Sequence, residues 1–101
     1  MKQTRKRRIL IVDDSEMNRE ILTGILENEY DIVEAEDGKK AIAVMEEGLY
    51  SFSIVLLDIT MPELDGFGVL QVMQQRNWLK ELPVIIISAE TSDEYIGHAY
   101  E

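Results

Sequence analysis

Three aspartates stand directly after apolar runs, where a buried strand would end. Asp13 and Asp14 follow Ile9–Val12, and Asp58 follows Ile54–Leu57. These runs show no polar alternation and are rich in isoleucine, leucine and valine, which is typical of strands buried on both faces of a parallel sheet. Because parallel strands end at the same edge of their sheet, the three carboxylates are predicted to converge on one small patch.

The chemistry open to such a patch is the binding of a metal ion. Clustered carboxylates repel one another, and a bound cation relieves that repulsion. A few oxygen ligands favour Mg²⁺ or Mn²⁺, completed by water and substrate oxygens. A carboxylate is also a competent nucleophile, and Ser88, which ends another apolar run, brings a hydroxyl to the same edge. Alternatively, Asp13 or Asp14 merely caps a helix that begins near Ser15, although capping does not require three acids.

The elements expected to position these residues alternate between strand and helix. Apolar residues recur at helical spacing after each of the first three strands, and the acid-containing run of residues 30–35 suits an edge strand. Such an order predicts an α/β fold, a doubly wound parallel sheet with strand order 2-1-3-4. The expected strands are 9–12, 30–35, 54–57 and 84–87; the expected helices lie at 17–26, 41–48, 67–74 and, after the capping-box pattern TSDE, 91–100.

Length and charge limit the function classes. The 101 residues fit one domain, there is no cysteine, and the net charge is −10. Half of the basic residues lie in residues 1–8, which we interpret as a solubilising arm ahead of a domain at residues 9–101. The acidic body is expected to repel nucleic acid and anionic membrane. The first apolar run is too short for a membrane span, so the chain is expected to be soluble and cytoplasmic.

Three segments, ILIVDDSEMNREIL, IVLLDITMPELDGFGVL and PVIIISAE, resemble the receiver domain of two-component response regulators. The resemblance runs from Ile9 to the end of the chain. Its most specific part is D-x-x-M-P-x-x-D-G at residues 58–66, preceded by the strand-ending pair of aspartates. It implies the flavodoxin-like receiver fold, in which Gly66 helps to shape the loop after the phosphorylated residue.

The resemblance also implies a role for individual residues. Asp58 would accept a phosphoryl group from a phosphohistidine on a sensor histidine kinase or phosphotransfer protein. Ser88 would be the switch hydroxyl that turns toward the phosphoryl oxygens, and Thr60 and Glu90 would tune the rate at which the phosphoryl group is lost. The implied Mg²⁺ ligands are Asp13, which acts through water, Asp14, Asp58 and the backbone carbonyl of Thr60.

The sequence departs from the family pattern at its end. Receivers have a fifth strand, which carries a lysine that pairs with the phosphoryl group, and a fifth helix. This chain reaches Glu101 within the expected fourth helix, and no other basic residue is a convincing substitute for that lysine. The strand at 84–87 would then be an exposed edge, and the apolar face of the first helix would be bare. We therefore expect a homodimer or domain swap through this edge, unless the chain is a fragment.

Three functions compete. The first is a phospho-accepting signalling module that catalyses only its own phosphorylation and dephosphorylation. The second is a phosphohydrolase of the haloacid dehalogenase kind, which needs a second acid where Thr60 stands. The third is a non-phosphorylated interaction or dimerisation scaffold, suggested by the missing lysine. The first is favoured, and the sequence identifies neither the kinase, nor the signal, nor the output.

Overall fold

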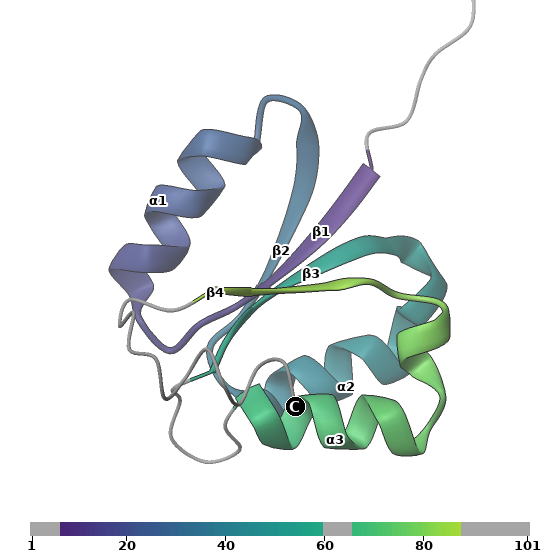
Figure 1. Ribbon diagram of the computed structural model, residues 1–101. Helices are drawn as coiled ribbons and strands as arrows, with labels where there is room; N and C mark the ends of the chain where they lie inside the picture. The colour runs from purple at the N-terminus through teal and green to yellow at the C-terminus, as the bar shows by residue number, and fades with distance from the viewer. Residues whose placement is uncertain (1–6, 60–65, 88–101) are drawn as a thin grey trace, which may run out of the picture.

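A computed structural model describes residues 7–59 and 66–87 of the chain, apart from the side chain of Tyr50. Its centre is a sheet of four parallel strands in the order β2-β1-β3-β4 (Figure 1). The predicted sheet and its strand order are confirmed, with the 30–35 strand at an edge. The strands are β1 (Arg7–Val12), β2 (Tyr30–Ala35), β3 (Phe52–Asp58) and β4 (Val84–Ile87).

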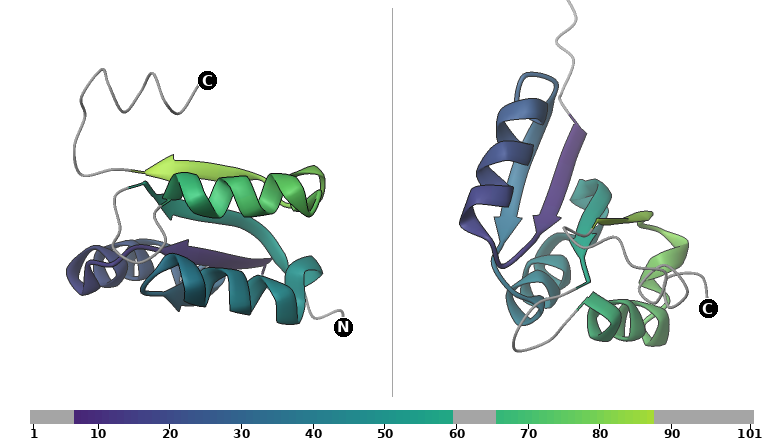
Figure 2. Two further views of the ribbon diagram at one scale, coloured as in Figure 1. Left: turned by 90° about the horizontal axis from the view of Figure 1, so that it is seen from below. Right: turned by 60° about the vertical axis from the view of Figure 1, so that its left-hand side comes forward.

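Helices cover both faces of the sheet, as a doubly wound fold requires. Figures 1 and 2 show α1 against one face and α2 with α3 against the other. The helices are α1 (Glu16–Leu26), α2 (Gly38–Gly48) and α3 (Gly66–Gln75), with short 3₁₀ turns η1 (Leu49–Ser51) and η2 (Trp78–Lys80). Within the described ranges, no helix is long and apolar enough to span a membrane. The helix predicted at 91–100 lies outside the described residues.

The main core lies between the sheet and the pair α2 and α3. Alternate residues of the two central strands, Leu10 and Val12 in β1 and Val55 and Leu57 in β3, point to this side, since successive side chains of a strand face opposite ways. The core consists of Leu10, Val12, Ala35, Ala41, Met45, Phe52, Val55, Leu57, Val69, Met73 and Leu82.

The opposite face is thinly covered. Helix α1 contains no buried residue. The side chains of Met17, Ile21 and Ile25, spaced four apart along it, are all more than half exposed. An apolar groove of about 330 Å³ runs along the sheet beside α1, and Ile54, Leu56 and the exposed Ile85 contribute to its lining. The bare apolar face of the first helix, expected from the sequence, is thus confirmed.

Local hydrogen bonds fix where the helices begin and end. Asp37 is the N-cap of α2, and its carboxylate accepts from the backbone N–H of Lys40 at 2.8 Å. After α3, the chain turns at Asn77, which has a left-handed backbone with φ of 61°. The preceding Arg76 pairs with Glu46 of α2 at 2.6 Å and stacks over Trp78. The two helices on this face are therefore tied together at one end.

The turn at Asn77 gives a stability prediction. Asparagine tolerates a left-handed backbone better than most residues that have a Cβ, because its short polar side chain can hydrogen-bond locally, and glycine adopts this backbone freely. We expect Asn77→Ala to lower the free energy of unfolding by about 1 kcal/mol, whereas Asn77→Gly leaves it within about 0.5 kcal/mol of the wild-type value. Urea unfolding followed by circular dichroism measures both. Equal losses in the two variants would contradict a conformational origin.

Candidate metal centre

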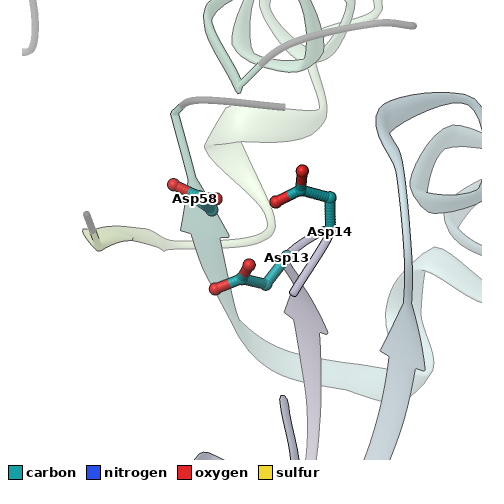
Figure 3. Close-up of side chains that lie close together, drawn as sticks. All are labelled: Asp13, Asp14 and Asp58. Atoms are coloured by element: carbon teal, nitrogen blue, oxygen red, sulfur yellow. The ribbon is translucent and has the colours of Figure 1, made fainter. Parts of the chain in front are cut away.

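The acids meet because β1 and β3 are parallel neighbours. The register pairs Val12 with Leu57, so Asp13, the first residue after β1, lies beside Asp58, the last residue of β3 (Figure 3). One carboxylate oxygen from each of Asp13, Asp14 and Asp58 lies within 4.8 Å of the others. The predicted convergence of the three acids is confirmed, whereas the role of each residue stays a prediction.

The three acids differ in their access to water. Asp13 and Asp58 are 3% and 5% exposed, and Asp14 is exposed. A buried carboxylate is costly unless hydrogen bonds or a cation compensate for its lost hydration. Two buried acids and one accessible acid thus form a half-open site, with room for water on the side of Asp14.

Hydrogen bonds hold the backbone N–H, the backbone carbonyl and the carboxylate of Asp13. Its backbone N–H donates to the carbonyl of Ala35 at 3.1 Å, which continues the pairing of β1 with β2. Its carboxylate accepts from the N–H of Ser15 at 2.9 Å and from the amide of Asn18 at 3.4 Å. Its carbonyl accepts from the guanidinium of Arg19 at 2.6 Å. Asp13 therefore has little freedom to move.

The residue that caps α1 is Ser15. Its hydroxyl accepts from the backbone N–H of Asn18 at 3.2 Å. The alternative in which Asp13 or Asp14 is no more than the cap is therefore wrong, because Ser15 occupies that position. The carboxylate of Asp13 instead accepts a hydrogen bond from the backbone N–H of Ser15, and the side chain of Asp14 faces the other acids.

Two contacts with Asp13 were not anticipated from the sequence, those of Asn18 and Arg19. Both residues lie on α1, whose helical periodicity identifies only its apolar positions. One signal was available, because a cation near the N-terminus of a helix opposes the helix dipole. An arginine at that position, four residues after a serine cap, indicates a specific acceptor nearby.

The donor set fits a divalent cation of the Mg²⁺ type. Hard oxygen ligands, two or three carboxylates and access for water are what Mg²⁺ uses in proteins. The ligand atoms of Asp13, Asp14 and Asp58 are close enough to share one ion. Bound there, a cation would neutralise the negative charge that the fold concentrates at this edge.

Other predicted site residues fall outside the described ranges. These are Thr60, Ser88 and Glu90. The neighbouring described residue is Ile87, the last residue of β4 and the register partner of Asp58. Their roles therefore stay predictions.

Gly66 packs directly on the strand end that carries Asp58. A Cβ built at Gly66 would lie 2.4 Å from the carbonyl oxygen of Asp58 and 2.5 Å from the Cα of Ile59. Neither backbone atom can give way by a rotamer change. Helix α3 can begin so close to β3 only because residue 66 has no side chain.

A family model, the response regulator receiver domain, matches residues 9–101. The chain belongs to this family. Two-component response regulator ORR5 of Oryza sativa subsp. japonica is 31% identical over 92% of this chain and 69% of its own length. As a receiver domain, the chain is a phosphoacceptor signalling domain rather than a classical enzyme.

Solved receiver structures share both fold and sequence with this domain. A chain of the CheX–CheY–BeF₃–Mg²⁺ complex from Borrelia burgdorferi superimposes with a TM-score of 0.80 at 33% identity, covering 93% of this chain and 70% of that one. TrrA from Thermotoga maritima, in complex with Mg²⁺ and BeF, has a TM-score of 0.78 at 33% identity, covering 90% and 75%. The flavodoxin-like fold of a response regulator is thereby established.

Substitution of Gly66 tests the close contact beneath Asp58. Gly66→Ala must displace backbone, and we expect it to lower the free energy of unfolding by about 2–3 kcal/mol. The matched control is Gly24→Ala in α1, where nothing lies within 4 Å of the new Cβ. That variant should raise stability by about 0.5–1 kcal/mol, because alanine favours helix more than glycine. Urea unfolding compares the two; destabilisation by both would argue against the contact.

Proposed function

We propose that Asp58 of this receiver domain accepts a phosphoryl group from a phosphohistidine, beside a divalent cation held by the neighbouring acids. The partner would be a sensor histidine kinase or a phosphotransfer protein. The observation that carries the proposal is the position of Asp58, at the end of a buried strand and within 4.8 Å of two other acids. Asp58 thus stands where the two neighbouring acids would hold a cation beside it, which supports its proposed role as the acceptor.

In the transfer step, a carboxylate oxygen of Asp58 attacks the phosphorus atom. A P–O bond forms while the P–N bond to the imidazole breaks, and the electron pair of that bond returns to the nitrogen. A bound divalent cation supplies charge neutralisation for the equatorial oxygens. Asp13 and Asp14 would hold that cation and take no part in the bond changes, which suits a reaction served mainly by alignment and electrostatics. Attack of water on the acyl phosphate would release inorganic phosphate and regenerate Asp58.

The ion that we propose is Mg²⁺, with Mn²⁺ as a substitute. The Borrelia and Thermotoga relatives contain Mg²⁺ with a beryllium fluoride, and the acids of this chain have the oxygen donors that both ions accept. We assign Asp13 to a water-mediated contact and the others to direct contacts. The proposed ligands are Asp13, Asp14, Asp58 and the backbone carbonyl of Thr60.

Phosphorylation would act through the chain that follows β4. Ile87 is paired with Asp58, so Ser88 follows the strand that neighbours the acyl phosphate. We propose that its hydroxyl donates to a phosphoryl oxygen and thereby biases two arrangements of the segment after it. Thr60 and Glu90 are proposed to tune how long the phosphoryl group persists.

The competing scaffold function is less favoured. No contact among the described residues favours it, whereas the three acids and the family membership both support the phosphoacceptor. The expected cytoplasmic location and the lack of nucleic-acid binding belong to the same proposal. The acidic composition supports the latter, since like charges repel.

A self-association proposal has separate support. Among the described residues β4 pairs only with β3 and lies at an edge of the sheet (Figure 2). Its Ile85 side chain is 49% exposed. An exposed apolar edge strand pairs readily with another chain. We propose that the 101-residue chain forms a homodimer, or a domain-swapped one, through this edge.

Phosphorylation can be tested by intact-mass spectrometry. After incubation with Mg²⁺ and acetyl phosphate, we expect the wild-type chain to gain the mass of one phosphoryl group, and Asp58→Asn to gain none. Asp37→Asn is the matched control, because asparagine also caps a helix and the site is untouched. Omission of Mg²⁺ should abolish the gain. An unmodified wild-type chain, or an adduct that persists in Asp58→Asn, would favour the scaffold.

Self-association can be tested by light scattering coupled to size exclusion. We expect the wild-type chain to elute as a dimer and Ile85→Lys as a monomer, because a lysine on an edge strand opposes strand addition. Leu79→Lys is the control, an equal change at another exposed apolar residue, on η2. A wild-type monomer at all concentrations would rule out the dimer without touching the phosphoryl-transfer proposal.

A further inference from the structure

Arg19 connects the acid cluster to the edge of the sheet. Its Nη1 donates to the backbone carbonyl of Asp13 at 2.6 Å. Its Nε lies 3.0 Å from a carboxylate oxygen of Glu34, on β2. The side chain is only 13% exposed. A guanidinium with two separate acceptors and little access to water has a fixed orientation.

Glu34 is itself held in place. The hydroxyl of Thr23 donates to its second carboxylate oxygen at 3.0 Å. Both oxygens of Glu34 therefore have partners, one on each of two α1 residues. The resulting chain of contacts runs from Thr23 through Glu34 and Arg19 to the carbonyl of Asp13.

The carbonyl that Arg19 holds belongs to the peptide that joins Asp13 to Asp14. That peptide is planar, so fixing its oxygen also fixes the direction in which the chain enters Asp14. Asp13 has additional hydrogen bonds of its own. Asp14 is exposed and makes no hydrogen bond or ion pair in the described part of the chain. Its place beside Asp58 thus depends on the backbone before it.

We propose that Arg19 is a positioning residue for the metal centre, which sets the affinity for a divalent cation by fixing the Asp13–Asp14 peptide. This inference rests on the proposed function, because it takes the acid cluster as the cation site. Thr23 and Glu34 act through Arg19 by orienting its guanidinium. Arg19 contacts the backbone carbonyl of Asp13 and the carboxylate of Glu34, and no carboxylate of the acid cluster, so its proposed contribution is to geometry.

The charge of Arg19 acts in the opposite direction and must be separated from its geometry. A guanidinium near the cluster repels a cation, so simple loss of charge would strengthen Mg²⁺ binding. Arg19→Lys keeps the charge and removes the planar fork, which lysine cannot reproduce at a site with two acceptors. The contribution of geometry is then measured with the charge unchanged.

The experiment is calorimetric titration of Mg²⁺ into the full-length chain, without any phosphodonor. Loss of contacts that orient metal ligands typically costs 10–100-fold in affinity. We expect the Kd of Arg19→Lys for Mg²⁺ to rise by roughly tenfold. The matched control is Arg76→Lys, the same change at an arginine that pairs with Glu46 of α2 and makes no contact with the acid cluster; it should bind Mg²⁺ as the wild type does.

A second variant keeps the inference testable if Arg19→Lys does not fold. Thr23→Val removes only the hydroxyl that orients Glu34, and it should weaken Mg²⁺ binding in the same direction but less. Urea unfolding of each variant distinguishes a structural role, which would lower stability while leaving the Kd of the folded protein unchanged.

The outcomes are distinct. Wild-type affinity in Arg19→Lys, or in Thr23→Val if the first variant is unfolded, overturns the positioning role and leaves the proposed function standing. No Mg²⁺ binding by the wild-type chain overturns the cation site and this inference together. A weaker Kd in Arg19→Lys with no phosphorylation of Asp58 keeps the inference and removes the phosphoacceptor.

Discussion

The parallel pairing of β1 with β3 is the interaction on which the rest of the structure depends. With Val12 opposite Leu57, the residues that follow the two apolar runs must lie side by side, whatever their charge. The burial of those runs between helices on both faces supplies the free energy that holds like-charged groups together. A shift of one residue in this register would turn every side chain of one strand to the opposite face, so the core and the acid cluster specify the same alignment.

The sequence was sufficient for most of the sheet. Uninterrupted runs such as Ile9–Val12 mark strands whose two faces are both covered, and the acids within residues 30–35 mark an edge. The convergence of Asp13 with Asp58 followed from the topology alone. Strands β1 and β3 are longer than predicted, because pairing extends to residues such as Arg7 and Phe52 that lie beyond the apolar runs.

The network around Asp13 was beyond sequence reasoning. Arg19 and Glu34 are fifteen residues apart, and their meeting depends on the angle at which α1 lies across β2. Helical periodicity gives the direction of an apolar stripe but not the docking angle of the helix, which side-chain packing decides. Even the stripe was ambiguous, since the exposed Met17 and the half-buried Leu22 have the same apolar character. Polar partners across elements are therefore found only once packing is known.

The contact of Gly66 with the backbone of Asp58 has a mechanical consequence. Between most helices and strands lies a layer of side chains, which absorbs small displacements by rotamer adjustment. At this junction no side chain separates the two elements, since the backbone of α3 at Gly66 packs on the carbonyl oxygen of Asp58 and the Cα of Ile59. A displacement of the last residues of β3 must therefore shift α3 as a whole or bend the strand. A displacement at the end of β3 is therefore transmitted directly to the start of α3.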